Sequence, residues 1–172
     1  MIVEPTGAVR HRRCAEPAAT EALGAALAAA LGAAHDASPD RALIVFLRGP
    51  LGSGKTTLAR GWLRGLGVAG SIRSPTFSLL EHYPLGALNV LHIDLYRLNS
   101  PRDLAGLGLA DFDHAGAVWL IEWPEQAEAE LPPPDLELRL TTGADSHDVQ
   151  LQARSVPGER WLERLDRQLA ST

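Results

Sequence analysis

Residues 42–56, Ala-Leu-Ile-Val-Phe-Leu-Arg-Gly-Pro-Leu-Gly-Ser-Gly-Lys-Thr, decide the fold. The first six residues are a continuous apolar run, which is typical of a central strand covered on both faces. The run is followed by a full match to the pattern G-x-x-x-x-G-K-[ST], and residues 55–66 then place apolar side chains four apart, which predicts a helix. A strand, a glycine-rich loop and a helix in this order are the context that a phosphate-binding loop requires.

The chemistry expected of this loop follows from its residue types. Glycines let successive backbone N–H groups approach an anion closely, and the helix that follows adds its positive N-terminal end. Lys55, the only lysine in the chain, would neutralise charge on the β- and γ-phosphates, and the hydroxyl of Thr56 would ligate Mg²⁺. The nucleotide-binding residues predicted here are Gly49, Leu51, Gly52, Ser53, Gly54, Lys55, Thr56 and Thr57.

Two carboxylates end apolar strands further along the chain. Asp94 closes residues 90–94, and Glu122 closes residues 118–122. In α/β folds with such a loop, the carboxyl ends of neighbouring strands lie at the same edge of the sheet as the loop. Either acid can ligate Mg²⁺, with Thr56, while the other orients or deprotonates a water molecule. Both are therefore candidate metal ligands and, with Lys55, candidate catalytic residues. The alternative is that each acid is simply solvated at a strand end or caps a helix.

Three further candidates have equally plausible structural roles. Ser74-Pro75-Thr76 could act as a switch whose hydroxyls reach the γ-phosphate or Mg²⁺, or it could be a turn before a strand. Trp123 could stack on a base or a partner, or it could pack. Arg97 could contact phosphate or be an ordinary surface charge.

The remaining pattern predicts one α/β domain over residues 1–172, with a mixed sheet between helices and two antiparallel hairpins. Helices are expected from Pro17, from Ser100-Pro101 and near the C-terminus at 157–172. Further strands are expected at 8–13, 77–83, 90–95, 118–123, 136–140 and 149–153.

Composition excludes several classes of protein. With 172 residues, 16 basic and 21 acidic side chains, the net charge is −5, which argues against binding nucleic acid through a bulk basic surface. The single cysteine, Cys14, forms no internal disulfide. Charges within residues 1–14 argue against a signal peptide, and the apolar stretch at 23–34 is short and interrupted by glycine, so we expect no membrane span and a cytoplasmic protein. Residues 111–114, Asp-Phe-Asp-His, are expected to form a loop rather than a metal site.

Other motifs narrow the class of nucleotide-binding protein. There is no N-K-x-D motif of guanine-reading GTPases and no L-S-G-G-Q motif of transporter ATPases. Four segments occur in order: the loop, Ser-Pro-Thr-Phe at 74–77, His-Ile-Asp-Leu-Tyr-Arg-Leu at 92–98, and Ile-Glu-Trp-Pro at 121–124. Over about residues 16–140 the chain thereby resembles the TsaE (YjeE) family of bacterial ATPases required for tRNA threonylcarbamoyladenosine synthesis.

The resemblance implies roles for particular residues. The loop would hold the phosphates of ATP, Thr56 would bind Mg²⁺, and residues 74–77, including Thr76, would act as a switch. Thr20, in the segment 16–20, would lie near adenine, and Trp123 would lie close to the nucleotide. The family acts with a transferase subunit, TsaD, and its partner TsaB, so this chain would meet tRNA only indirectly.

Two other functions remain open from the residues alone. A small-molecule kinase that phosphorylates an acceptor hydroxyl would use Asp94 as the base and Arg97 as a phosphate clamp. A nucleotide-gated binding module would bind ATP without meaningful turnover. Dependence on a small acceptor separates the kinase from the ATPase, which would respond to partner proteins instead. In the binding module, Glu122→Gln would leave partner binding and tRNA modification unchanged, whereas Lys55→Ala would abolish both.

Overall fold

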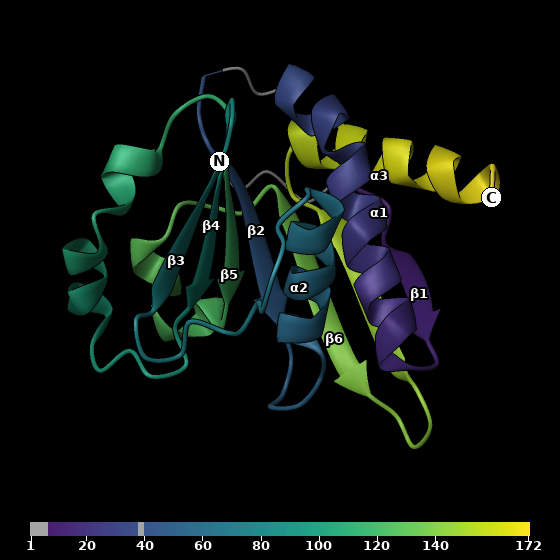
Figure 1. Ribbon diagram of the computed structural model, residues 1–172, viewed down its shortest axis with the longest axis horizontal. Coiled ribbons are helices and arrows are strands. Elements are labelled where there is room, and N and C mark those ends of the chain that lie inside the picture. Colours follow the sequence, from purple (N-terminus) through teal and green to yellow (C-terminus); the bar gives the residue numbers. More distant parts are fainter. Residues whose placement is uncertain (1–6, 38–39) are drawn as a thin grey trace.

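The computed structural model describes residues 7–37 and 40–172. Residues 1–6 therefore lie outside the described residues, and they belong to the segment 1–14 in which we expect no signal peptide. Within the described residues seven strands form one mixed sheet (Figure 1). The strands are β1 (Arg10–Cys14), β2 (Leu43–Arg48), β3 (Leu80–Leu85), β4 (Leu88–Asp94), β5 (Ala117–Glu122), β6 (Leu136–Thr142) and β7 (His147–Ala153).

The strand order is β1-β7-β6-β2-β5-β4-β3. The strand that precedes the glycine-rich loop, β2, runs parallel to both of its neighbours, β5 and β6, and β4 runs parallel to β5. The pairs β3–β4, β6–β7 and β1–β7 are antiparallel. The expected α/β class, with a mixed sheet and antiparallel hairpins, is confirmed. Because β2, β4 and β5 are parallel, their carboxyl ends meet at one edge of the sheet.

Three α-helices cover one face of the sheet, namely α1 (Pro17–Asp36), α2 (Lys55–Gly65) and α3 (Val156–Ala170) (Figure 1). Their apolar residues share one core with alternate strand residues such as Val45 and Leu120. Trp62 of α2 and Trp161 of α3 meet edge to face with ring centroids 5.1 Å apart. The indole N–H of Trp161 donates to the carbonyl of Leu27 at 2.9 Å, which ties α3 to α1.

The opposite face is covered by short 3₁₀ segments at Pro101–Leu107, Leu109–Phe112, Pro124–Gln126 and Glu128–Glu130. The helix expected from Ser100-Pro101 starts there, and the Ser100 hydroxyl caps it by accepting from the Arg102 N–H at 3.3 Å. The helix is 3₁₀, and it ends at Leu107 because Gly108, the next residue, has a positive φ. The sheet therefore lies between α-helices on one face and 3₁₀ segments on the other.

Most strand boundaries differ from expectation by one to three residues, and two of these differences have a clear local cause. The strand expected over 77–83 begins only at Leu80, because the N–H of Leu79 donates to the carbonyl of Pro75 at 2.7 Å and closes a turn, with Leu79 at φ +63°. The strand expected to reach Trp123 ends at Glu122, since Trp123 has φ +58° and leaves the extended conformation. Both differences fall beside the acid-bearing edge of the sheet.

Helix α1 is long and apolar enough, by length and composition, to cross a membrane, although its sequence suggested a stretch too short to do so. In the structure its residues Leu23, Leu27 and Leu31 are buried in the core shared with α2 and α3. The apolar residues on one face of the helix therefore pack against the protein's own core.

Candidate functional site

The glycine-rich loop leaves the carboxyl end of β2 and enters α2 at Lys55, at the lower edge of the sheet in Figure 1. Gly49, Gly52 and Gly54 all have positive φ. At Gly49 a Cβ atom would lie 2.4 Å from the carbonyl oxygen of Leu140, so only glycine fits there. At Gly54, which precedes α2, φ is +100°, a conformation in which a residue with a side chain would be strained. The glycines of the motif are thus required by the shape of the loop.

Lys55 is folded back over this loop and is only 4% exposed. Its ammonium group donates to the carbonyls of Gly49 at 2.6 Å and Pro50 at 3.0 Å, and it lies 4.1 Å from the centre of the Trp123 ring. Burial lowers the pKa of Lys55 from its ordinary value of 10.5, and the nearby carboxylates, first Glu122, oppose that shift. A cation held in this way is a ready partner for an anion that enters the loop.

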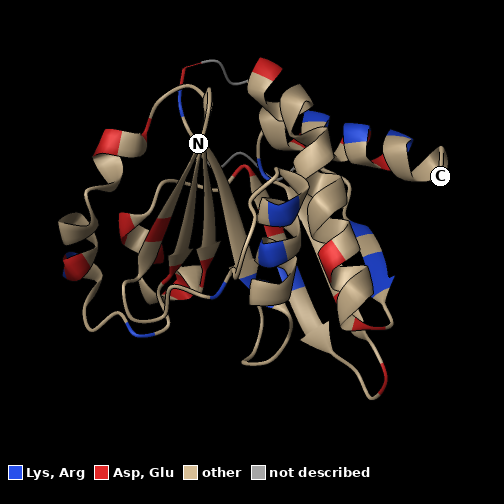
Figure 2. Ribbon diagram, viewed as in Figure 1, with Lys and Arg blue, Asp and Glu red and all other residues tan. Residues whose placement is uncertain are grey.

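The next residue contacts one of the two acids. The hydroxyl of Thr56 donates to the carboxylate of Glu122, with both oxygens at 3.0 Å. Glu122 is only 2% exposed. It is the Cα partner of Asp94 in the parallel pair of β4 and β5, so the two acids lie side by side. Acidic residues gather at the lower ends of the central strands in Figure 2.

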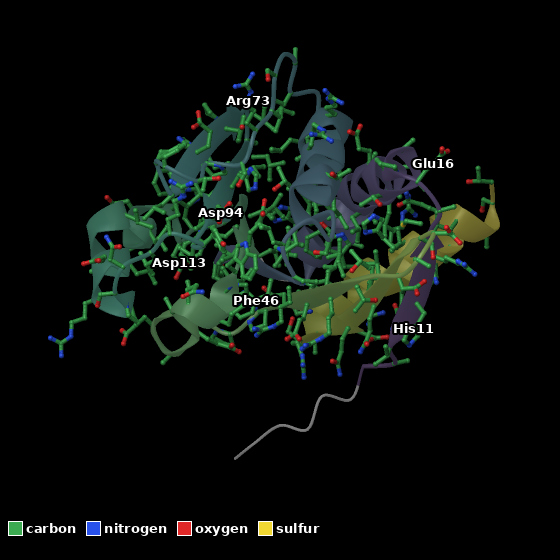
Figure 3. The ribbon with its side chains drawn as sticks, turned by 90° about the horizontal axis from the view of Figure 1, so that it is seen from below. His11, Glu16, Phe46, Arg73, Asp94 and Asp113 are labelled. Carbon is green, nitrogen blue, oxygen red and sulfur yellow. The ribbon has the colours of Figure 1, made fainter. Side chains whose placement is uncertain are left out.

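Asp94 is also buried, and its oxygens already have donors. The hydroxyl of Ser74 donates to one oxygen, and the backbone N–H of Tyr96 donates to the other at 2.9 Å. Seen from below in Figure 3, Asp94 lies toward the middle of the molecule, whereas Arg73, next to Ser74, lies on the edge. The segment that begins at Ser74 is thus anchored to the end of β4.

A second contact anchors the same segment. The guanidinium of Arg97 lies 4.4 Å from the centre of the Phe77 ring, and that ring is 85% exposed. The rings of Tyr96 and Trp123 lie 4.9 Å apart. Segment 74–77 is therefore held at one end by Asp94, the last residue of β4, and at the other by Arg97, which follows β4.

These groups enclose a cavity of about 460 Å³. Its lining residues are Leu51, Gly52, Ser53, Gly54, Lys55, Thr56, Thr57, Ser74, Thr76, Asp94, Tyr96, Arg97, Glu122 and Trp123. The structure thus brings together nearly all of the residues that the sequence selected. Gly49 stands just outside the lining and takes part through its carbonyl. Thr20 is buried next to the loop, with its methyl group 3.6 Å from where a Cβ on Gly54 would be, and its place near adenine stays a prediction.

Two histidines near the site were not among the site residues predicted from the sequence. His92 is fully buried, and its Nε2 lies 2.7 Å from Oε1 of Glu122. His147, at the start of β7, has its Nδ1 4.0 Å from where a Cβ on Gly54 would be. The spacing of His92, two residues before Asp94 in an otherwise apolar strand, was the signal that could have found it, because residues i and i+2 share one face of a strand.

The donor set at this edge suits a hard cation. It consists of two carboxylates and a hydroxyl, which are oxygen ligands of the kind that Mg²⁺ prefers. Within residues 7–37 and 40–172 no group of three or more His, Cys, Asp and Glu side chains is arranged to hold a metal ion by itself. Any cation here would complete its coordination with oxygens from a ligand or from water.

Fold and site together define the class: an α/β protein whose candidate site lies where a glycine-rich loop meets two acids at the carboxyl edge of parallel strands. Within that class the chain belongs to the TsaE family. The family model for "Threonylcarbamoyl adenosine biosynthesis protein TsaE" matches residues 14–151, which is most of the chain.

Individual relatives agree with the family model. The tRNA threonylcarbamoyladenosine biosynthesis protein TsaE of Haemophilus influenzae is 38% identical over 120 residues, covering 70% of this chain and 76% of that protein. The protein of the same name from Bacillus subtilis is 34% identical over 125 residues, covering 72% and 78%. The crystal structure of Bacillus subtilis YdiB matches with a TM-score of 0.75 and 27% identity, and the match covers 96% of this chain and 99% of that one.

Proposed function

We propose that this chain is a Mg²⁺-dependent ATPase that supports the threonylcarbamoylation of adenosine 37 in tRNA. The observation that carries the proposal is the contact between Thr56 and Glu122 at 3.0 Å. It joins the phosphate-binding motif to the edge of the sheet at which Asp94 and Glu122 lie. The family to which the chain belongs is named for threonylcarbamoyladenosine biosynthesis. Membership of the family supports a role in threonylcarbamoyladenosine biosynthesis, and the residues of the site support Mg²⁺-dependent hydrolysis of ATP.

The loop and Lys55 hold the phosphates of ATP in this proposal. Backbone N–H groups of residues 52–57 surround the anion, and the N-terminal end of α2 adds its favourable dipole. Lys55 exchanges its bonds to the Gly49 and Pro50 carbonyls for phosphate oxygens. That exchange favours binding, because a buried ammonium gains a full negative partner in place of neutral carbonyls.

Thr56 and Glu122 hold the metal ion, either directly or through water, with Asp94 beside them. When bound, Mg²⁺ neutralises charge on the β- and γ-phosphates. Glu122 is the acid on the metal side, since its carboxylate already contacts the hydroxyl of Thr56. Asp94 then orients the attacking water, and its two donors, Ser74 and the Tyr96 N–H, fix the direction of its carboxylate.

The segment around Ser74 links the nucleotide-binding cavity to the protein surface. Ser74 bonds to Asp94 inside the cavity, while Phe77, three residues on, is exposed. A γ-phosphate that attracts the hydroxyls of Ser74 and Thr76 therefore changes the position of an exposed aromatic side chain. Segments of this kind act as nucleotide-dependent switches.

Partners complete the proposed activity. The chain acts in the cytoplasm with a TsaD-like transferase and a TsaB-like protein, and those proteins bring it to tRNA. A net charge of −5 suits binding to tRNA through partner proteins, because the chain has no excess of basic residues with which to bind a nucleic acid directly.

Reconstitution tests the proposed function. Purified TsaD- and TsaB-like proteins, tRNA, and a source of threonylcarbamoyl groups are combined with and without this chain, and modified tRNA and released phosphate are measured. We expect slow ATP hydrolysis by the chain alone and repeated rounds of modification only when it is present. Modification that proceeds equally well without the chain, or ATP turnover that requires a small hydroxyl acceptor, would contradict the proposal, and the second result would indicate a kinase.

A further inference from the structure

His92 occupies an unusual place for a polar side chain. It is fully buried within β4, on the face that α1 and α2 cover, with Leu120 of β5 as its Cα partner. Val90 and Leu120, on the same face, belong to the apolar core. An imidazole in such a place is costly unless both ring nitrogens are satisfied.

Only one ring nitrogen of His92 has a partner in the part of the chain that the structure describes. Nε2 lies 2.7 Å from Oε1 of Glu122, whereas Nδ1 is buried with no hydrogen-bond partner. An ionised carboxylate can only accept, so Nε2 carries the proton and donates it to Glu122. The burial of His92 is therefore compensated through Glu122 alone.

The carboxylate of Glu122 is thereby held from two sides. His92 donates to Oε1, and the Thr56 hydroxyl lies 3.0 Å from Oε1 and Oε2. The two donors come from different elements, β4 and the first turn of α2. A donor from a neighbouring strand fixes the rotation of a carboxylate that a single hydroxyl would leave free.

We propose that His92 is a positioning residue that fixes the Glu122 carboxylate in the orientation in which it and Thr56 serve the same cation. This inference rests on the proposed ATPase function and adds a residue to it. Residues that orient metal-site carboxylates typically contribute about 10- to 100-fold to metal affinity or activity.

Three substitutions at one position test it. His92→Leu removes the donor and keeps the bulk, His92→Gln places an amide N–H close to where Nε2 lies, and His92→Asn carries the same amide on a shorter side chain. We expect His92→Leu and His92→Asn to raise the Mg²⁺ concentration for half-maximal ATP turnover about tenfold and to lower kcat, with the KM for ATP changed less than about threefold. His92→Gln should recover most of both losses.

The matched control is His35→Leu. His35 lies on α1 and also has a buried ring nitrogen without a partner among the described residues, but it does not touch the cavity. His35→Leu should leave the Mg²⁺ dependence unchanged. Thermal unfolding of each variant checks the fold, and if His92→Leu does not fold, the comparison of His92→Gln with His92→Asn decides.

A readout that needs no turnover separates this inference from the proposed function. In ¹⁵N spectra of the histidine rings, His92 should show the Nε2–H tautomer, and Glu122→Ala should shift its Nε2 resonance. An Nδ1–H tautomer, or equal Mg²⁺ dependence in His92→Gln and His92→Leu, overturns the role of His92. Wild-type protein without ATP turnover contradicts the proposed function instead, whatever the tautomer.

Discussion

The hydroxyl oxygen of Thr56 lies 3.0 Å from each carboxylate oxygen of Glu122. Thr56 comes from the first turn of α2 and Glu122 from the last residue of β5, so the contact joins two elements that are far apart in the sequence. It places an acid directly against the hydroxyl that the loop motif assigns to a metal ion. The proposed chemistry depends on the charge of that acid.

Glu122→Gln tests that charge. The amide keeps the shape of the side chain and can still accept from Thr56, but it no longer attracts a cation. We expect ATP turnover to fall about 100-fold and the Mg²⁺ concentration for half-maximal turnover to rise, with the affinity for metal-free ATP nearly unchanged. Phosphate release across a Mg²⁺ titration measures both effects. Glu125→Gln, an exposed acid three residues on, is the control; if it slows turnover as much as Glu122→Gln, the effect is not specific to the metal site.

Asp94→Asn separates the two acids. Asn can still accept from the Tyr96 N–H, so the end of β4 should keep its shape. If Asp94 orients water, kcat falls by about 100-fold while the Mg²⁺ dependence changes little. Steady-state kinetics at several Mg²⁺ concentrations measures this. A large rise in the required Mg²⁺ with a preserved kcat at saturation would instead make Asp94 the metal ligand.

Trp123 should report nucleotide binding. Its ring lines the cavity and lies over Lys55, whereas Trp62, Trp119 and Trp161 are buried in the core. We expect the intrinsic fluorescence to change when MgATP is added and the change to be lost in Trp123→Phe, because phenylalanine keeps an aromatic face while removing the indole. Fluorescence titration checks this. An unaltered signal in Trp123→Phe would mean that nucleotide does not reach this ring.

The stability of the protein should depend on the protonation of Lys55. Burial lowers the pKa of Lys55 below 10.5, so between the lowered pKa and 10.5 the unfolded chain binds a proton that the folded chain does not. The free energy of unfolding contributed by this group therefore rises with pH in that window. Lys55→Met removes the burial cost of the charge and should be more stable than wild type near neutral pH.

The difference between Lys55→Met and wild type should shrink as the pH rises toward 10.5. Urea unfolding of the two proteins side by side at several pH values measures it, and other titrating groups cancel in the comparison. A difference that stays constant with pH would show that Lys55 keeps its ordinary pKa in the folded protein.

The sequence predicted the structure best where a single pattern of neighbouring residues was sufficient. The continuous apolar run at 42–47 and the glycine motif after it needed no tertiary information, and both the strand and the helix formed as expected. The two acids could be selected because each ends an apolar strand. That they are direct Cα partners depends on β4 and β5 being neighbours and on the register of this pair, which no local pattern predicts.

The parts that sequence did not predict depend on contacts between distant segments. The strand expected from Phe77 starts at Leu80, because Ser74 and Phe77 turn toward Asp94 and Arg97 instead of pairing in the sheet. The contact between α1 and the loop, where the methyl group of Thr20 lies 3.6 Å from where a Cβ on Gly54 would be, also joins segments that are distant in the sequence. His92 looked like one residue of an apolar strand until β5 placed Glu122 within 2.7 Å of its ring.

ATP binding to Lys55→Met, measured by calorimetry, is the most direct test of the central claim that the loop and its single lysine hold a triphosphate. Arg60→Met is the matched control, because Arg60 is a cation on the same helix that pairs with Glu21 at 2.7 Å, away from the cavity. We predict that Lys55→Met binds MgATP about 100-fold more weakly than wild type, or about 2.8 kcal/mol, while Arg60→Met binds normally. Wild-type affinity in a folded Lys55→Met protein would contradict the account.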